Sequence, residues 1–512
     1  MNFDQQIKEN ETIRNHEGEK AYAMTPEMEL YSAVTTTMMD DTFYEEQDAR
    51  VERIAELVAK VDPLFTAQLA VYTRTQMNLR SAPLLLITEL ARIHNGDSLV
   101  SRTIAKTLLR ADEISELLSC YQLRNPKTTD KKLNKLSQQI KEGLQIAFNR
   151  FDEYQFAKYD RSSRQVKFRD ALFLVHPKAK DESQQAIFDK IVSGKLETPY
   201  TWETELSALG KQQFATPEEK EKAVTAKWEE LIDSGRLGYM AMLRNLRNFL
   251  IHHVSDRHLE MVCERIADEK SVLESKQLPF RFLSAYRQIV ENDVISEEAL
   301  PVADHLLDAL ERAVQISVGN IRGFSPDTRV LMACDVSGSM CIGVSDKSSV
   351  QLFDVGLLLS MLFKSTCREV TVGIFGDTWK TIRLQNSNVL ARTLQMRERE
   401  GEVGYATNGY AVIEWLLEKQ RIVDKVLMFT DCQMWDNTPE GKHIRQSWRK
   451  YKALAPNAQL YLFDLAGYGH SPFKEQELNV RIISGWSDKV FDMLHALENG
   501  ASVLEEIRAI EI

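Results

Sequence analysis

The sequence has few of the residues that mark secreted, fibrous or membrane proteins. Six cysteines are spread over 512 residues without a C-x-x-C pair, which argues against a zinc site or a disulfide framework and favours reduced thiols. With 22 glycines and 13 prolines, the chain is too poor in both for a collagen-like or linker-dominated architecture. The longest apolar run, near residues 355–363, is far shorter than the roughly 20 residues that cross a bilayer. Because the N-terminus is polar where a signal peptide is apolar, we expect a cytoplasmic protein without membrane attachment.

An excess of basic residues is also absent, since the formal net charge is −11. The chain as a whole is therefore no polycation built to coat nucleic acid or anionic lipid, and any such binding must come from a local basic surface. A length of 512 residues with 43% hydrophobic residues predicts at least two folded units with real cores.

Residues 1–322 read as a long series of amphipathic helices. Thr25–Pro26 and Thr216–Pro217 each place a hydroxyl before a proline, which is typical of a helix start, and Glu219 completes a capping box with Thr216. Strand-like runs are scarce in this part. Helices joined by short loops predict either an α-solenoid of low repeat fidelity or a compact all-α domain.

Residues 326–512 have a different sequence pattern, in which short runs rich in β-branched residues alternate with segments of helical periodicity. This alternation predicts a parallel sheet covered on both faces, which binds ligands at the carboxyl ends of its strands. The predicted strands are Arg329–Cys334, Glu369–Phe375, Lys425–Phe429, Gln459–Phe463 and Val480–Ile483. The predicted helices are Ser349–Lys364, Tyr410–Gln420, His443–Leu454 and Lys489–Leu497.

The sharpest motif, DVSGSM, directly follows the first predicted strand and contains Asp335, Ser337 and Ser339. Two further loops at strand ends supply Thr407 in GYATNGY and Asp431 in FTDCQMWD. Carboxylates and hydroxyls are hard oxygen ligands, which suit Mg²⁺. The alternative interpretation of the motif is an Asp/Ser turn without a metal.

These five residues resemble the metal-ion-dependent adhesion site of von Willebrand factor A domains. The resemblance implies that the hydroxyls and the threonine contact the ion, that the acids often act through water, and that a partner's carboxylate can fill the open position. It implies a binding site and no enzyme. An aspartyl-phosphate nucleophile at Asp335 is a conceivable alternative, although Val336–Ser337 does not supply the second acid that this chemistry usually needs.

The stretch from Arg124 to Lys180 is basic in an otherwise acidic chain, and aromatic residues are interleaved with its cations. Cations neutralise phosphates, and exposed rings stack on unpaired bases. Alternatively, the aromatics belong to a core and the charges to a solvated helix face. The aromatic residues are Phe148, Phe151, Tyr154, Phe156, Tyr159 and Phe168. A second cluster contains Arg244, Arg247 and Arg281, which would line one concave surface if the helices stack in parallel.

Five segments in order resemble the TROVE module: NHEGEKAYAMTPEMELY, DPLFTAQLAVYTRTQMNLRSAPLLLITELAR, KYDRSSRQVKFRDALFLVHPKA, GYMAMLRNLRNF and LPFRFLSAY. Followed by a von Willebrand A-like domain, this module resembles the Ro 60 kDa autoantigen family, in a bacterial form. The resemblance implies an N-terminal all-α, HEAT-like solenoid closed into a monomeric ring (1–322) and a C-terminal α/β doubly wound domain (326–512).

The resemblance also implies a function in RNA quality control. Ro proteins bind the 3′ single-stranded ends of misfolded noncoding RNAs in a central hole and Y RNA on an outer basic surface, and bacterial members are tethered to the exonuclease polynucleotide phosphorylase. We expect no DNA partner. By this resemblance Lys167, Arg169 and His176, with Arg164 nearby, are candidates for the outer surface, and Arg244 and Arg247 for the hole. Tyr405–Ala406 stands where the family usually has glycines.

A second hypothesis comes from another class of protein. The A domain could act as a metal-dependent scaffold that recruits an acidic partner, with the helices merely holding it.

Overall fold

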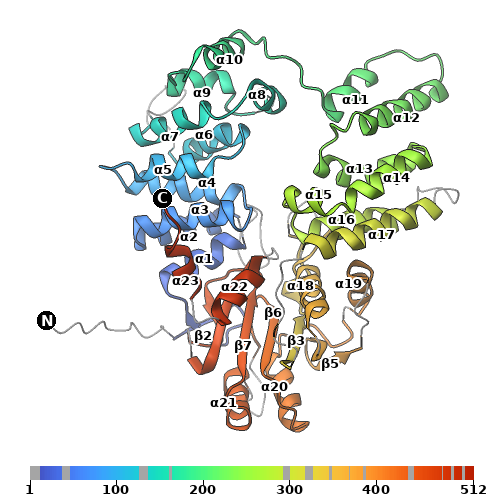
Figure 1. Cartoon of the computed structure of the whole chain (residues 1–512). Helices are drawn as coiled ribbons and strands as arrows, with labels where there is room; N and C mark the ends of the chain where they lie inside the picture. Colours follow the sequence, from blue (N-terminus) through green and yellow to red (C-terminus); the bar gives the residue numbers. More distant parts are fainter. Residues whose placement is uncertain are drawn as a thin grey trace. The chain divides into compact units, whose positions relative to one another are not determined.

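The computed structural model describes residues 12–36, 47–125, 136–160, 164–291, 300–317, 324, 327–344, 349–367, 369–383, 388–399, 401–435, 443–474, 477–485, 489–498 and 502–512. The chain forms two compact units (Figure 1), which we call the sheet unit (Met1–Val61 and Asn320–Glu506) and the helical unit (Asp62–Gly319 and Ile507–Ile512). Residues 12–36 and 47–61, which the sequence pattern groups with the helices, therefore belong to the sheet unit. The expected closure into a ring stays a prediction.

The helical unit begins with α3, where Asp62 accepts a hydrogen bond from the backbone N–H of Leu64 and Pro63 occupies the first helical position. The predicted start of α12 is confirmed, because the hydroxyl of Thr216 accepts from the N–H of Glu219. The helices of this unit are α3 (Pro63–Thr75), α4 (Ser81–Ile93), α5 (Leu99–Thr107), α6 (Asp112–Arg124), α7 (Gln138–Phe148), α8 (Glu153–Tyr159), α9 (Phe168–Val175), α10 (Glu182–Ser193), α11 (Trp202–Gly210), α12 (Pro217–Asp233), α13 (Tyr239–Ile251), α14 (Asp256–Ile266), α15 (Glu269–Ser275), α16 (Pro279–Val290) and α17 (Leu300–Ser317).

Each helix of this unit packs mainly on helices close to it in sequence, which is typical of a solenoid. Thus α3 packs on α4 and α5, α5 on α7, and α16 on α13 and α17. The contact of α5 with α7 requires Gly143, since a Cβ there would lie 2.6 Å from Cβ of Ile104. None of the described helices combines the length and the apolar character needed to cross a bilayer.

The sheet unit contains a six-stranded sheet of order β5-β4-β3-β6-β7-β9, in which every neighbouring pair is parallel except β4 and β5. All five predicted strands are confirmed, and the antiparallel edge strand β5 adds to them. The strands are β3 (Arg329–Asp335), β4 (Glu369–Phe375), β5 (Trp379–Ile382), β6 (Lys425–Thr430), β7 (Gln459–Asp464) and β9 (Val480–Ser484). The helices are α18 (Leu352–Thr366), α19 (Val389–Arg397), α20 (Gly409–Glu418), α21 (Ile444–Leu454), α22 (Lys489–Glu498) and α23 (Val503–Arg508).

Successive side chains of the central strands point to opposite faces of the sheet, and both faces are buried. On one face, Leu331, Met428 and Leu460 pack in a core with side chains of α20 and α21 such as Trp448. On the other face α18 packs on β3 and β6, and the ring of Phe463 lies 6.1 Å from that of Phe491 in α22. The sheet is therefore doubly wound, as predicted.

The N-terminal part of the sheet unit adds a hairpin that the sequence does not predict and a helix whose start at Thr25–Pro26 it does predict. Strands β1 (Thr12–Arg14) and β2 (Lys20–Ala23) form a hairpin, and β2 pairs with the two-residue strand β8 (His470–Ser471). Helix α1 (Pro26–Thr35) follows, and the hydroxyl of Tyr31 donates a hydrogen bond to the carbonyl of Ser484 (3.0 Å). Helix α2 (Gln47–Lys60) supplies Arg50, which donates to the carbonyl of Ala466 (2.6 Å).

Candidate functional site

The five predicted metal-site residues lie at the carboxyl-terminal edge of the six-stranded sheet, and all five are buried. Strands β3 and β6 are parallel neighbours, so Asp335 at the end of β3 and Asp431 directly after β6 reach the same edge. Ser337 and Ser339 belong to the turn and short 3₁₀ helix after β3, and their hydroxyl oxygens lie 3.4 Å apart. The structure thus brings these side chains together at the end of the sheet where such folds bind ligands.

Thr407 is held at this edge by contacts between neighbouring loops. A carboxylate oxygen of Asp377 accepts a hydrogen bond from the N–H of Ala406 (2.8 Å), and the N–H of Gly338 donates to the carbonyl of Tyr405 (3.1 Å). The loops approach so closely that a Cβ on Gly376 would lie 2.1 Å from the carbonyl oxygen of Gly404. The sequence singled out Thr407 but missed Asp377, which follows β4 and positions the threonine loop.

The two carboxyl groups of the site have unequal hydrogen bonding. Both oxygens of Asp335 accept hydrogen bonds, from the N–H of Ser337 (2.9 Å) and from the hydroxyl of Thr430 (2.6 Å). Asp431 accepts one from the N–H of Gln433 (3.0 Å), whereas no described residue donates a hydrogen bond of good geometry to its buried Oδ2. Among the described residues, Oδ2 of Asp431 is therefore left without a hydrogen bond of good geometry, although the Ser339 hydroxyl is close enough to lower the pKa of Asp431 in part.

The surroundings of the pair disfavour negative charge on both carboxyl groups at once. Burial raises the pKa of Asp335 above its usual value, and hydrogen bonds from Ser337 and Thr430 lower it in part. Burial raises the pKa of Asp431 as well, and the charge of Asp335 raises it further. Burial also raises the pKa of a third carboxyl, Asp464, but there hydrogen bonds from Ser32 and two backbone N–H groups and the charge of Arg50 act in the opposite direction.

These residues fit a small hard cation. Two acids and three hydroxyls offer oxygen ligands only, and Oδ2 of Asp431 lacks the partner that buried polar atoms require. Among the described residues, no group of three or more His, Cys, Asp or Glu side chains could hold a metal ion. Any metal at this edge would therefore depend on the serine and threonine hydroxyls, which suit Mg²⁺ better than zinc.

The N-terminal hairpin supports the loop that carries Asp431. The side-chain amide of Asn15 donates to the carbonyl of Met434 (2.8 Å), and the N–H of His16 donates to the side-chain oxygen of Gln433 (3.0 Å). Gln433 in turn donates to the carbonyl of Asp431 (3.2 Å). Sequence reasoning could not find these partners, because more than 400 residues separate them from the loop.

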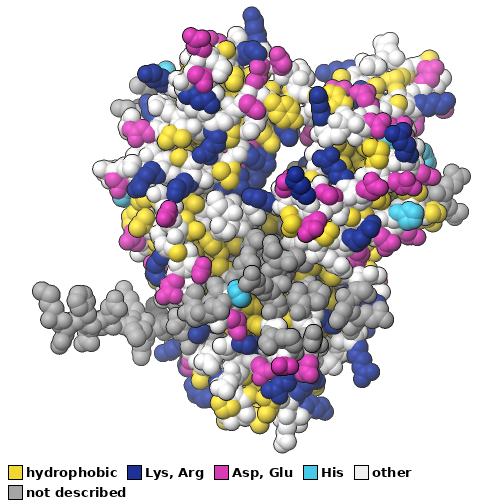
Figure 2. All heavy atoms as spheres, in the orientation of Figure 1, with side chains coloured by type: hydrophobic (Ala, Val, Ile, Leu, Met, Phe, Trp, Pro, Cys, Tyr) yellow, Lys and Arg dark blue, Asp and Glu magenta, His cyan; other side chains and the backbone are white. Residues whose placement is uncertain are grey.

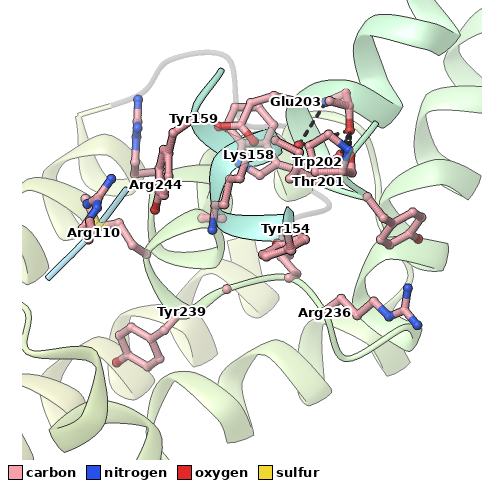
Figure 3. A pocket seen from close by; sticks show the side chains of 18 of the residues that line it. Arg110, Tyr154, Lys158, Tyr159, Thr201, Trp202, Glu203, Arg236, Tyr239 and Arg244 are labelled. Atoms are coloured by element: carbon pink, nitrogen blue, oxygen red, sulfur yellow. Dashed lines mark hydrogen bonds between the residues drawn. The ribbon is translucent and has the colours of Figure 1, made fainter. Parts of the chain in front are cut away.

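A second candidate site is a cavity of about 1310 Å³ in the helical unit. On the face drawn in Figure 2, Lys and Arg side chains gather around the hollow in this unit. Figure 3 shows Tyr154 and Lys158 of α8 and Arg244 of α13 pointing into the cavity. Its charged and aromatic lining residues are Arg74, Arg80, Arg110, Tyr154, Lys158, Tyr159, Asp160, Glu197, Tyr200, Trp202, Glu203, Arg236, Tyr239, Arg244, Lys276 and Arg281.

The cations of this cavity fall into two groups. Arg74, Arg80 and Arg110 are paired with acids of α6, for example Arg80 with Asp112 at 2.9 Å. The other five have no ion pair among the described residues, namely Lys158, Arg236, Arg244, Lys276 and Arg281. Lys158 instead lies 5.6 Å from the ring of Tyr159, and Arg236 lies 5.6 Å from that of Tyr200. The cavity therefore combines unneutralised positive charge with aromatic rings.

Comparison with known proteins identifies the family. The TROVE domain family model matches residues 10–194 and 187–305, which is more than half of the chain. The chain belongs to the TROVE domain family. A second family model, the Ro60 vWA domain, matches residues 329–497 of this TROVE protein. Its resemblance to the Ro type, expected from the sequence, is confirmed.

One solved structure resembles this chain in its fold, and two curated relatives resemble part of it in sequence. The fold is similar to that of the crystal structure of the Deinococcus radiodurans Ro (RSR) protein, with a TM-score of 0.60 and 17% identity over 93% of this chain and 100% of that chain. Telomerase protein component 1 of Mus musculus is 48% identical over 95 residues, and that of Rattus norvegicus is 48% identical over 92 residues. These matches cover 19% and 18% of this chain, and the chain spans only 3% of the length of either relative.

Within the TROVE part, three of the predicted RNA-binding residues mark the ends of α9 and are exposed. Lys167 is the residue before the helix and Arg169 lies in its first turn, with its guanidinium 5.8 Å from the ring of Phe173. His176 ends the helix with a left-handed backbone (φ 51°). The structure therefore places these three side chains at the two ends of one short helix.

The remaining predicted residues are not grouped with α9. The guanidinium of Arg164 lies 3.4 Å from Asp112 and 3.7 Å from Glu116, so its charge is already offset within the protein. Arg244 lines the cavity together with Arg281, whereas Arg247 lies outside it and donates to the side chain of Gln288 (3.3 Å).

The aromatic residues of the basic stretch divide in the same way. Four of them, Phe148, Phe151, Phe156 and Phe168, are buried in one aromatic cluster, so they cannot stack on a base. Tyr154, which is 48% exposed, and Tyr159 line the cavity. Sequence reasoning missed Arg236 and Lys276 as cavity residues, since an isolated cation in a loop carries no periodic signal.

Proposed function

We propose that this TROVE protein binds RNA and that the cavity of the helical unit holds the single-stranded 3′ ends of misfolded noncoding RNAs. The observation that supports this proposal is that five cations of one cavity have no ion pair among the described residues and lie with aromatic rings, of which Tyr154 is exposed. Cations attract phosphates, and unpaired bases stack on aromatic side chains without requiring a particular sequence. The proposed role is RNA quality control in the cytoplasm, as a binding protein rather than an enzyme.

A hairpin RNA with a 3′ single-stranded tail should bind more tightly than the same hairpin with a blunt end. If all five cations contact phosphates, the slope of log K against log salt should be about −3.5, because each neutralised phosphate of a single strand contributes about −0.7. Fluorescence anisotropy over a range of salt concentrations measures both quantities. Equal affinity for tailed and blunt RNA, or a slope near zero, would count against the cavity as the binding site.

The exposed ends of α9 are the proposed site for structured RNA, with a Y RNA as the expected ligand. Lys167 and Arg169 lie at the start of the helix and His176 at its end, all three are exposed, and Arg164 contributes little because it is paired internally. An exonuclease such as polynucleotide phosphorylase is the further proposed partner, reached through the bound RNA.

Replacing Lys167, Arg169 and His176 by alanine should weaken the binding of structured RNA by about 1 kcal/mol for each lost charge-assisted contact. Gel-shift titration measures the change. The matched control is the triple alanine variant of Lys220, Lys222 and His253, which are exposed and lie outside α9. An affinity that falls equally in both variants would show a general charge effect and no binding site on α9.

A second candidate function uses the sheet unit as a metal-dependent surface for an acidic protein partner. The observation that favours it is a pair of exposed rings beside the candidate metal site: Tyr405 is 55% exposed and Trp435 is 40% exposed. Both are joined to the site's loops, since the carbonyl of Tyr405 accepts from Gly338 and the N–H of Trp435 donates to Thr407. Aromatic residues beside an open coordination position suit a carboxylate flanked by apolar groups.

A further inference from the structure

The wall of the cavity in the helical unit contains two arginines, and the positive charge of one acts on the other. Helix α13 places Arg244 and α16 places Arg281 in the cavity wall. Surrounding protein and the charge of Arg244 both lower the pKa of Arg281, and no acid among the described residues acts on it in the opposite direction. The guanidinium of Arg281 lies 5.1 Å from the ring of Phe280, which is itself buried. The cavity wall therefore holds two like charges for which the described part of the chain supplies no ion-pair partner.

The beginnings of the same two helices add to this positive potential. Gly238 precedes α13 and Leu278 precedes α16, and both residues line the cavity. Neither has a side chain that accepts a hydrogen bond from the first turn, in contrast to Thr201 at the start of α11. The first turn of α13 therefore leaves N–H groups available to an anion. Helix α16 adds mainly its positive end, because it begins with Pro279 and the N–H of Arg281 donates to the carbonyl of Leu278 (2.8 Å).

The charge balance indicates which kind of phosphate such a site prefers. An internal phosphodiester carries one negative charge, whereas a phosphomonoester carries about −1.5 to −2 at pH 7 and offers three acceptor oxygens. Two guanidinium groups can each donate a pair of hydrogen bonds to phosphate oxygens. A dianion therefore offsets the two arginines better than a monoanion does. Across the cavity, Tyr154 and Lys158 can hold the base and the phosphate of a preceding nucleotide (Figure 3).

We propose that Arg244 and Arg281 bind the phosphomonoester at the end of an RNA strand. This inference rests on the proposed RNA binding in the cavity and adds to it the chemistry of the strand end. A 3′-phosphate and a 5′-phosphate share this chemistry, and so does free phosphate, so the test separates the three sources.

The test measures the affinity of the full-length protein for one short single-stranded RNA that carries an internal fluorophore. The RNA is prepared with hydroxyls at both ends, with a 3′-phosphate, or with a 5′-phosphate, and the salt concentration is held constant. One of the phosphorylated forms should bind about tenfold more tightly than the hydroxyl form, which corresponds to one added charge-assisted contact. The form that gains affinity identifies the end. Inorganic phosphate at equal concentration should not remove the gain, because it lacks the contacts of the neighbouring nucleotides.

The double variant Arg244→Gln and Arg281→Gln should abolish the gain. The charge-matched control, Arg257→Gln with Lys270→Gln, removes two exposed cations outside the cavity and should keep it. Equal affinity for all three RNAs, a gain that persists in the Arg244/Arg281 variant, or removal of the gain by inorganic phosphate would overturn the strand-end site while leaving RNA binding intact. Absence of binding to every RNA would instead refute the proposed function itself.

Discussion

Replacing Glu113 with alanine is expected to lower the free energy of unfolding of the helical unit by about 3–5 kcal/mol, because it removes one partner of a buried ion pair. Glu113 is fully buried at the start of α6. Its carboxylate pairs with Arg74 (2.8 Å) and accepts hydrogen bonds from the N–H groups of Leu109 (2.7 Å) and Arg110 (3.0 Å). The substitution would leave the guanidinium of Arg74 and both N–H groups without this acceptor. Denaturant titration followed by circular dichroism measures the loss.

The neighbouring acid Glu116 supplies the matched control. Its side chain is 35% exposed and pairs with Arg80 at 3.2 Å, yet its pKa is raised, because burial and the charges of Asp112 and Glu113 together outweigh the effect of the nearby arginines. Glu116→Ala should therefore cost about 1 kcal/mol or less, as an exposed ion pair does. Should Glu113→Ala fail to fold, Glu113→Gln keeps an acceptor and should lose less stability. Equal losses for Glu113→Ala and Glu116→Ala would contradict this account of α6.

Much of the sheet unit could be predicted because its strands are apolar runs buried on both faces. The predicted strand Glu369–Phe375 has the observed bounds, and the parallel neighbours β3 and β6 bring Asp335 and Asp431 to one edge. Strand β5 was missed because it is four residues long, partly exposed and antiparallel. The hairpin of β1 and β2 was missed because its partner β8 has two residues and lies far away in the chain.

The cavity shows a different limit of sequence reasoning. A basic stretch with interleaved aromatic residues suggested stacking, but the pattern could not separate buried phenylalanines from exposed tyrosines. Phe156 is part of the core, whereas Tyr154, two residues earlier, lines the cavity. Ion pairs divide the basic residues in the same way. Arg164 is paired with acids of α6, whereas Lys158 has no ion pair among the described residues. Such partners come from distant helices, so they become visible only in the folded unit.

Replacing Asp431 with asparagine is expected to change the stability of the sheet unit in opposite directions with and without Mg²⁺. In the presence of a chelator, the variant should be as stable as the wild type or more so, because it removes the repulsion between two buried carboxylates, Asp335 and Asp431. With Mg²⁺ at about 100 times its Kd, the wild type should gain about 2.7 kcal/mol, and the variant should gain much less. Differential scanning calorimetry in the two buffers measures both effects.

Asp464 is the control that separates a metal effect from the general cost of altering a buried acid. It lies at the same edge of the sheet, but its hydrogen bonds come from Ser32 and from the backbone of Ala466 and Gly467. Asp464→Asn should therefore destabilise the unit equally in both buffers and leave the response to Mg²⁺ unchanged. A wild type whose unfolding temperature ignores Mg²⁺ would refute the metal site, and the metal-dependent protein partner would lose its basis with it.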